Sequence, residues 1–206
     1  MRAMTNGSKE NSDSGGISFL WEGQEPSQAE IDRVNADNLR RRQNFSIAAE
    51  YVVRAYSSIP AVHRIVLFGS VAAPPFKERY LRGRNDLTCV EVYHACADID
   101  LAVWIDDVRS IDDLRSARLA ALSELLVEKG IGVAHHQVDV FILNYPDGAY
   151  LGRLCVFGKC PARKYVCKAE GCGRIKFLRL HQGFAFMMAK LEASHPLCLF
   201  PGRGIA

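Results

Sequence analysis

The chain has 206 residues, of which 49% are hydrophobic and 24% are charged, an ordinary composition for a folded globular protein. This length is enough for one domain with a substantial core and a small appendage. The formal net charge of only +3 excludes a protein that binds nucleic acid through its overall charge, so any basic contact surface has to be local.

The first 24 residues have the composition of a disordered tail. Residues 5–16 are polar and offer almost no apolar surface to offset the entropy of ordering. This segment does not have the pattern of a secretory signal, and no apolar run in the chain reaches the roughly 18 residues of a membrane span. We therefore expect a cytoplasmic protein that makes no membrane contact.

A long helix is predicted after this tail. Ser27 followed by Glu30 forms a capping-box pattern, which is typical of a helix start. Apolar residues then recur at mostly helical spacing to about Tyr56, which indicates one long helix or a broken pair. The arginine run at residues 40–42 could touch phosphates, but a solvated helix face is the favoured interpretation.

An apolar strand is predicted at residues 65–68, followed directly by Gly69 and Ser70. Glycine lets the backbone approach a phosphate closely, and a helix N-terminus presents unpaired N–H groups to an anion. Pro74 and Pro75 would end a helix begun at Ser70. Residues 88–93 then indicate an extra strand.

Asp98 and Asp100 are one residue apart in an otherwise apolar segment. Successive side chains of a β-strand point to opposite faces, so we expect both carboxylates on one face. Mg²⁺ takes oxygen ligands and completes its coordination with water and substrate phosphates. The pair therefore predicts a site for Mg²⁺ or Mn²⁺. The alternative is that both are solvent-facing strand residues.

A helix is predicted from Ser110, as its N-cap, to Lys129, with Leu125 and Leu126 among its inward residues and Gly130 ending it. The next strand, residues 137–143, is apolar except for Asp139. A carboxylate inside a strand is costly to ionise unless it is paired, hydrogen-bonded or metal-bound. We therefore expect Asp139 beside the earlier acidic pair, in an α/β unit where helices cover a mixed sheet.

Taken in this order, Gly69 with Ser70, Asp98 with Asp100, and Asp139 resemble the nucleotidyltransferase superfamily that includes DNA polymerase beta. The resemblance covers residues 64–143 and implies a mixed sheet flanked by helices. It implies that the three aspartates are catalytic and hold Mg²⁺ or Mn²⁺, and that Gly69 and Ser70 bind the nucleotide. One departure is the long insertion at residues 71–97, because family members usually place the acidic pair closer to Gly-Ser.

The resemblance also implies a reaction: transfer of a nucleoside monophosphate from an NTP to a hydroxyl acceptor, with release of pyrophosphate. The acceptor could be a protein side chain, an RNA end or a small molecule such as an aminoglycoside. The alternative is a non-catalytic nucleotide-binding or interaction module, such as one half of a toxin–antitoxin-like pair. Retention of three mutually repelling carboxylates favours the enzyme, because a degenerate site has no reason to keep them together.

A second motif is a cluster of four cysteines, Cys155, Cys160, Cys167 and Cys172. In a reducing compartment such a cluster indicates a metal site rather than a disulfide framework. Four thiolates match a closed tetrahedral site for a structural Zn²⁺. His181 is an alternative ligand in place of Cys155, and the plainer interpretation is a set of unrelated thiols.

The cysteine segment is also basic, because Glu170 is the single acid among many Lys and Arg residues between residues 153 and 179. Interleaved aromatic residues, Phe177 among them, could stack on bases, so RNA or a phosphorylated partner could bind there. Alternatively, these cations compensate for the charge of zinc thiolates. We therefore divide the chain into a disordered tail (1–24), a nucleotidyltransferase domain (25–149) and a cysteine-rich zinc-binding segment with a C-terminal tail (150–206).

Overall fold

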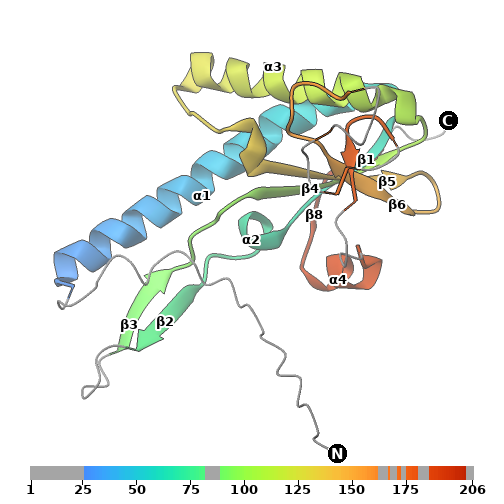
Figure 1. The fold of residues 1–206 in the computed structure, drawn as a ribbon. Coiled ribbons are helices and arrows are strands. Elements are labelled where there is room, and N and C mark those ends of the chain that lie inside the picture. The colour runs from blue at the N-terminus through green and yellow to red at the C-terminus, as the bar shows by residue number, and fades with distance from the viewer. Residues whose placement is uncertain are drawn as a thin grey trace, which may run out of the picture.

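The computed structural model describes residues 26–81, 89–161, 167, 171–172, 175–180 and 186–202. These residues form an α+β fold in which helices flank a mixed sheet, as the sequence predicted (Figure 1). The expected N-terminal tail and the alternative zinc ligand His181 lie outside the described residues. Within the described ranges, none of the helices combines the length and the apolar composition needed to cross a bilayer.

The main sheet has the strand order β7-β6-β5-β4-β1-β8. Its strands are β1 (Val62–Phe68), β4 (Ile99–Ile105), β5 (Val138–Asn144), β6 (Tyr150–Leu154), β7 (Leu178–Arg179) and β8 (Leu197–Phe200). Strands β4 and β5 run parallel and are joined through a helix, whereas the other neighbours run antiparallel. The expected strand, helix, strand unit is therefore present at the centre of the sheet.

Two long helices cover one face of this sheet, here called the α1–α3 face (Figure 1). Helix α1 (Gln28–Ser57) begins with the predicted capping box and is one continuous helix. Helix α3 (Ile111–Lys129) follows the 3-10 turn η1 (Val108–Ser110) and ends at Gly130 in a left-handed conformation. The buried core lies between these helices and the strand residues that point toward them, including Ile65, Leu101, Val103, Val140 and Ile142.

The intervening strand residues point to the opposite face, here called the α4 face. Val66, Ala102, Trp104 and Leu143 are buried there together with Leu191 of α4 (Met188–Ala193). Figure 1 shows α4 on the side of the sheet away from α1 and α3. Because side chains alternate between the two faces of a strand, the same strands build both cores.

The predicted insertion forms a second, two-stranded sheet. Helix α2 (Gly69–Ala72) ends just before the prolines, as predicted, and β2 (Lys77–Leu81) then pairs with β3 (Cys89–Tyr93). The strand predicted at residues 88–93 is thus confirmed. Val90 and Val92 pack on Ile31 and Val34 of α1, so the hairpin lies along the N-terminal half of that helix (Figure 1).

The chain after residue 149 supplies strands to both ends of the main sheet. Strands β6 and β7 extend it beyond β5, and β8 pairs with β1 at the other end. The 3-10 turn η2 (His135–Gln137) leads into β5. The cysteine-rich segment is therefore continuous with the sheet that carries the acidic residues.

Candidate acidic site on the α4 face

The predicted acidic residues lie at the start of the two parallel central strands. Asp100 of β4 and Asp139 of β5 are direct neighbours in register, and adjacent strands are about 4.8 Å apart. Both alternate with residues of the α1–α3 core and so point to the α4 face. Asp98 was expected on the strand, but β4 begins at Ile99, so Asp98 lies in the loop just before it. The alternation of side chains along β4 therefore does not determine which way the Asp98 side chain points.

Burial and neighbouring charges shift the pKa values of Asp100 and Asp139. Burial raises the pKa of Asp100 to about 7, with further contributions from Asp139 and Asp98, while Arg153 opposes the rise. Burial also raises the pKa of Asp139, against the attraction of Arg153. Asp139 is 6% exposed, and Asp98 and Asp100 are half-buried. The three carboxylates are thus near enough to influence one another.

Gly69 brings the backbone against this group. It has a φ of +73°, and a Cβ atom added there would collide with Asp100 Oδ2. Phe68, the residue before it, is the register partner of Asp100 across β1 and β4. The start of α2, with Gly69 and the half-buried Ser70, therefore adjoins Asp100 on the side away from Asp139.

Two arginines of α1 hold the segments that carry this corner. Arg42 Nη2 donates to the carbonyl oxygen of Val71 at 3.1 Å and also to that of Ala73. Arg41 Nη2 donates to the carbonyl oxygen of Ala97, just before Asp98, at 3.3 Å. Part of the run at residues 40–42 therefore positions backbone around the acidic site, a role that the expected solvated helix face does not include.

Arg153 of β6 is a site residue that sequence reasoning assigned only to the basic segment. Its Nη2 donates to Asp139 Oδ1 as an ion pair, and its side chain is 26% exposed. Strand β6 pairs with β5 so that Arg153 faces Phe141, two residues beyond Asp139. No local pattern signals this contact, because it depends on how two strands pair.

An aromatic cluster on the same face was also missed. Phe68, Phe141, Tyr150 and Phe186 lie on four separate segments, and the Phe186 ring is 5.5 Å from Tyr150, 5.6 Å from Phe141 and 6.0 Å from Phe68 between centroids. Phe68 and Phe141 are 5.4 Å apart. Phe177, which was considered for base stacking, is instead 6% exposed on the α1–α3 face, with the Arg115 guanidinium 3.5 Å above its ring.

The cysteines cluster on the other side of the same strands. Cys155 follows β6 and is buried in the α1–α3 core, and the three later cysteines are half-buried against that core. The Phe157 N–H donates to Cys155 Sγ at 3.5 Å. The backbone of Cys172 forms an isolated antiparallel β-bridge with that of Arg179 in β7. The described cysteines are thiols rather than disulfides.

Arg118 is a buried cation between the two sites. It is 2% exposed on α3 and donates from Nη1 to the carbonyl oxygen of Val138 at 3.1 Å and from Nη2 to that of Cys155 at 3.3 Å. It therefore ties the residue before Asp139 to the first cysteine. Arg118 was not identified from the sequence. It lies one helical turn after Leu114 and so shares the inward face of α3, although a charged residue is usually exposed.

The donor chemistry of both sites suits the expected metals. Carboxylates suit Mg²⁺ or Mn²⁺, and thiolates suit Zn²⁺. Among the residues that the structure describes, no group of three or more His, Cys, Asp or Glu side chains is arranged to hold one ion. At the acidic site, Arg153 is bonded to an oxygen of Asp139 that a shared ion would need.

Comparisons of the chain with protein-family models, with curated proteins and with solved structures give no match. Any functional conclusion therefore depends on the chemistry of the residues described above.

Proposed function

We propose that the protein is a metal-dependent nucleotidyltransferase, similar to the DNA polymerase beta superfamily, that moves a nucleoside monophosphate from an NTP to a hydroxyl acceptor. The observation that carries this proposal is the direct pairing of Asp100 with Asp139 on parallel strands, with the Gly69 turn against Asp100. Burial, together with neighbouring carboxylates, raises the pKa of Asp100 and of Asp139, and burying ionisable groups in this way destabilises a fold. A bound metal cation would stabilise the ionised carboxylates and so account for their presence together.

Each residue has a role in this proposal. Asp98 and Asp100 would hold Mg²⁺ or Mn²⁺. Asp139 would share a second metal ion and help to deprotonate the acceptor hydroxyl. The backbone at Gly69 and Ser70 cradles the β- and γ-phosphates. When bound, the metal supplies charge neutralisation on the triphosphate and favours ionisation of the attacking hydroxyl. The acceptor oxygen forms a bond to the α-phosphorus, and the bond to pyrophosphate breaks.

The aromatic cluster supports a nucleotide rather than a simple phosphate compound as the donor. Phe68 and Phe141 flank the strand positions of the two paired aspartates, and their rings lie on the α4 face with Phe186. Aromatic faces bind nucleobases by stacking, largely independent of base identity. The cluster adjoins the acidic group, which is where a base attached to a metal-bound triphosphate would need a partner.

We also propose that Cys155, Cys160, Cys167 and Cys172 hold one structural Zn²⁺, with His181 as the alternative to Cys155. Their shared location against one side of the core and the N–H bond to Cys155 Sγ support this proposal, because ligands of structural metals are commonly held by such outer contacts. A closed thiolate site leaves no open position for substrate, so its contribution is folding energy.

One observation favours the second candidate, a non-catalytic nucleotide-binding or interaction module such as half of a toxin–antitoxin-like pair. The Arg153 guanidinium neutralises Asp139 without any metal. An arginine that permanently occupies this carboxylate would leave a site that binds a nucleotide but transfers nothing.

Calorimetry with each of the four NTPs, with and without Mg²⁺, combined with an assay for pyrophosphate, tests the two candidates. For the enzyme we expect Mg²⁺-dependent binding and pyrophosphate release, both lost in Asp100→Asn. Asp113→Asn on the exposed surface of α3 is the matched control and should change neither. Metal-dependent binding without turnover would favour the nucleotide-binding module, and no NTP binding would contradict both the enzyme and the nucleotide-binding module.

A further inference from the structure

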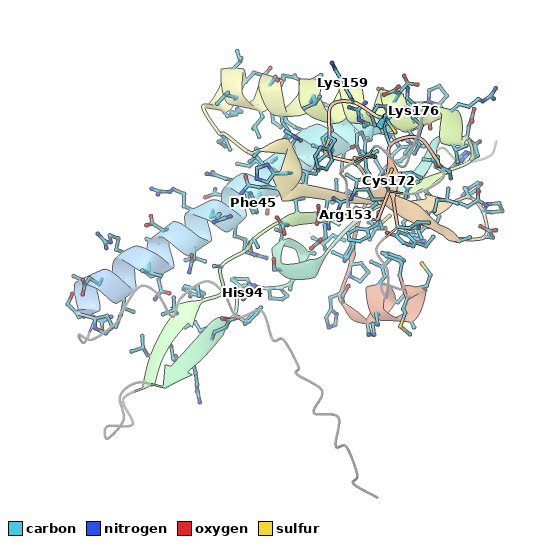
Figure 2. All side chains as sticks on the ribbon, in the orientation of Figure 1. Phe45, His94, Arg153, Lys159, Cys172 and Lys176 are labelled. Atoms are coloured by element: carbon cyan, nitrogen blue, oxygen red, sulfur yellow. The ribbon has the colours of Figure 1, made fainter. Side chains whose placement is uncertain are left out.

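Three charged residues of α3 lie one helical turn apart and form a row along the helix: Asp112, Arg115 and Arg118. The row begins at the cysteine-rich segment, because Lys176 Nζ donates to Asp112 Oδ2 at 2.9 Å. Arg115 Nη1 donates to Asp112 Oδ1 at 2.6 Å, which joins the first two members. Figure 2 shows Lys176 beside α3, whereas Arg153 lies at the level of the sheet.

Arg115 holds the chain that follows Cys155. Its Nη2 donates to the carbonyl oxygen of Phe157 at 3.2 Å and to that of Gly158 at 3.3 Å. Its guanidinium lies 3.5 Å from the ring centroid of Phe177, whose carbonyl oxygen accepts the N–H of Cys155 at 2.8 Å. The first turns of α3 are therefore bound to both ends of the cysteine-rich segment.

Arg118, one turn further, reaches the acidic site as well. Its two terminal nitrogens donate to the carbonyl oxygens of Val138 and Cys155, and its side chain is 2% exposed. Val138 directly precedes Asp139, so one rigid, planar guanidinium spans the start of β5 and the first cysteine. A shift of either carbonyl group therefore changes the bond to the other.

The charge of Arg118 also acts on both sites. Burial lowers the pKa of Arg118, and Asp139 and Cys155 are among the groups that oppose this decrease. Burial raises the pKa of Asp139, and Arg118 is one of the two arginines that oppose that rise. The row on α3 thus ends in a buried cation that lies between the aspartates and the cysteines.

We propose that Arg118 couples the two sites, so that zinc at the cysteines and a divalent cation at the aspartates strengthen each other's binding. This inference rests on the proposed function and concerns the regulation of the same acidic site. A single buried side chain that is bonded to the backbone of both sites is the physical connection that such coupling requires.

The sign of the coupling follows from charge and from geometry. With zinc bound, the cysteines are thiolates, and their negative charge holds the Arg118 guanidinium at the Cys155 carbonyl group. The fixed guanidinium in turn orders the Val138 carbonyl group and the strand start that carries Asp139. The thiolates also offset the positive field of Arg118, which otherwise repels a cation at Asp139. Both effects favour binding of the second metal.

The test measures zinc affinity by competition with a zinc-selective chelator, without Mg²⁺ and with saturating Mg²⁺ at constant ionic strength. Because coupling between two sites is reciprocal, this one comparison gives the coupling factor. We expect Mg²⁺ to raise the zinc affinity of the unaltered protein about tenfold. The increase should disappear in Asp100→Asn, which places the Mg²⁺ effect at the aspartates.

Arg118→Lys keeps the charge but replaces the planar fork by a single nitrogen, so we expect the Mg²⁺ effect to fall below about twofold. Arg115→Lys is the matched control, since Arg115 contacts only the cysteine side. It should weaken zinc binding while the effect of Mg²⁺ stays about tenfold. A purely structural role for Arg118 would lower both metal affinities without changing this factor.

Three results would overturn the inference: zinc affinity that does not respond to Mg²⁺ in the unaltered protein, an undiminished response in Arg118→Lys, or no zinc binding at the cysteines. The first comparison needs no variant, so it decides the matter even if Arg118→Lys does not fold. Failure of the proposed transferase function is distinct, because it appears as absent pyrophosphate release from NTP while the mutual effect of the two metals persists.

Discussion

The Asp100 carboxyl group is half-buried near two other acids. Its pKa is raised to about 7, well above the ordinary value of 3.8. The folded protein therefore binds a proton that the unfolded chain releases between pH 4 and 7. Stability falls as the pH rises through this window and is lowest above pH 7. We predict that Asp100→Asn removes much of this slope and stabilises the protein at pH 8 by about 1–3 kcal/mol.

Urea unfolding of the metal-free protein at pH 5, 6, 7 and 8 measures this effect. Asp113→Asn, on the exposed surface of α3, is the control and should leave the pH dependence unchanged. Parallel stability curves for Asp100→Asn and the unaltered protein would contradict the prediction.

Gly69 and Gly130 both have a positive φ, but their surroundings differ. A Cβ at Gly69 collides with the Asp100 carboxylate, whereas a Cβ at Gly130 has nothing within 4 Å. We predict that Gly130→Ala costs about 1 kcal/mol of unfolding free energy and Gly69→Ala about 2–4 kcal/mol. In the Asp100→Ala background the cost of Gly69→Ala should approach that of Gly130→Ala. Chemical denaturation of the four variants gives this cycle, and an unchanged cost at Gly69 would exclude the collision.

At the residue scale, the sequence identified Gly69, Asp100 and Asp139 because each breaks a local pattern. Asp139 interrupts an apolar strand, and the Gly-Ser pair ends another. Arg153 and Phe186 break no such pattern. They join the site only because β6 pairs with β5 and because α4 covers that face of the sheet. Contacts between distant segments leave no signal in a single sequence.

At the scale of elements, periodicity was sufficient for both long helices but not for every side chain on them. The capping box at Ser27 begins α1, and Gly130 ends α3. Leu126 was expected to face inward and is instead 54% exposed, while Arg118 takes an inward position. Ser110 precedes α3 but makes no side-chain cap bond, because its Oγ donates to the carbonyl oxygen of Asp107.

The strands after residue 149 were not predicted, for a physical reason. Strand β7 has two residues, and β6 contains Gly152, whose absent side chain lets the Arg179 carbonyl approach closely. Such strands are stabilised by their neighbours rather than by their own β-propensity. Their existence therefore depends on pairing with neighbouring strands.

The cysteine segment provides a prediction at the same scale. If the cysteines hold a structural Zn²⁺, Cys160→Ser or Cys172→Ser should lose the metal and cost on the order of 4 kcal/mol or more. Cys198→Ser, on the exposed part of β8, is the control and should retain both the metal and the stability. Elemental analysis and thermal unfolding measure the two effects. If protein purified without added zinc contains no zinc and is still as stable as the Cys198→Ser variant, the cysteines are simple packing residues.

At the scale of the whole molecule, the C-terminal quarter completes the sheet around the acidic site. Strand β6 supplies Arg153 and covers the edge of β5, α4 buries Leu191 against Trp104, and β8 pairs with β1. The division at residue 149, which the composition suggested, therefore cuts through one sheet. An unpaired strand with an apolar face is a site of aggregation, and removal of these segments would expose both β5 and β1.

We predict that a chain ending at Ala149 does not fold into a stable domain, whereas removal of residues 1–24, polar in composition, has little effect. The physical reason is that truncation removes the segments that cover the α4-face core. It also removes Cys155, so the buried Arg118 guanidinium keeps only one of its two carbonyl acceptors, that of Val138. Circular dichroism melts and size-exclusion chromatography of the two truncated chains measure the difference. Cooperative unfolding of the Ala149 chain at the temperature of the full chain would show that residues 26–149 hold their own core, and that the cysteine segment is an appendage to it.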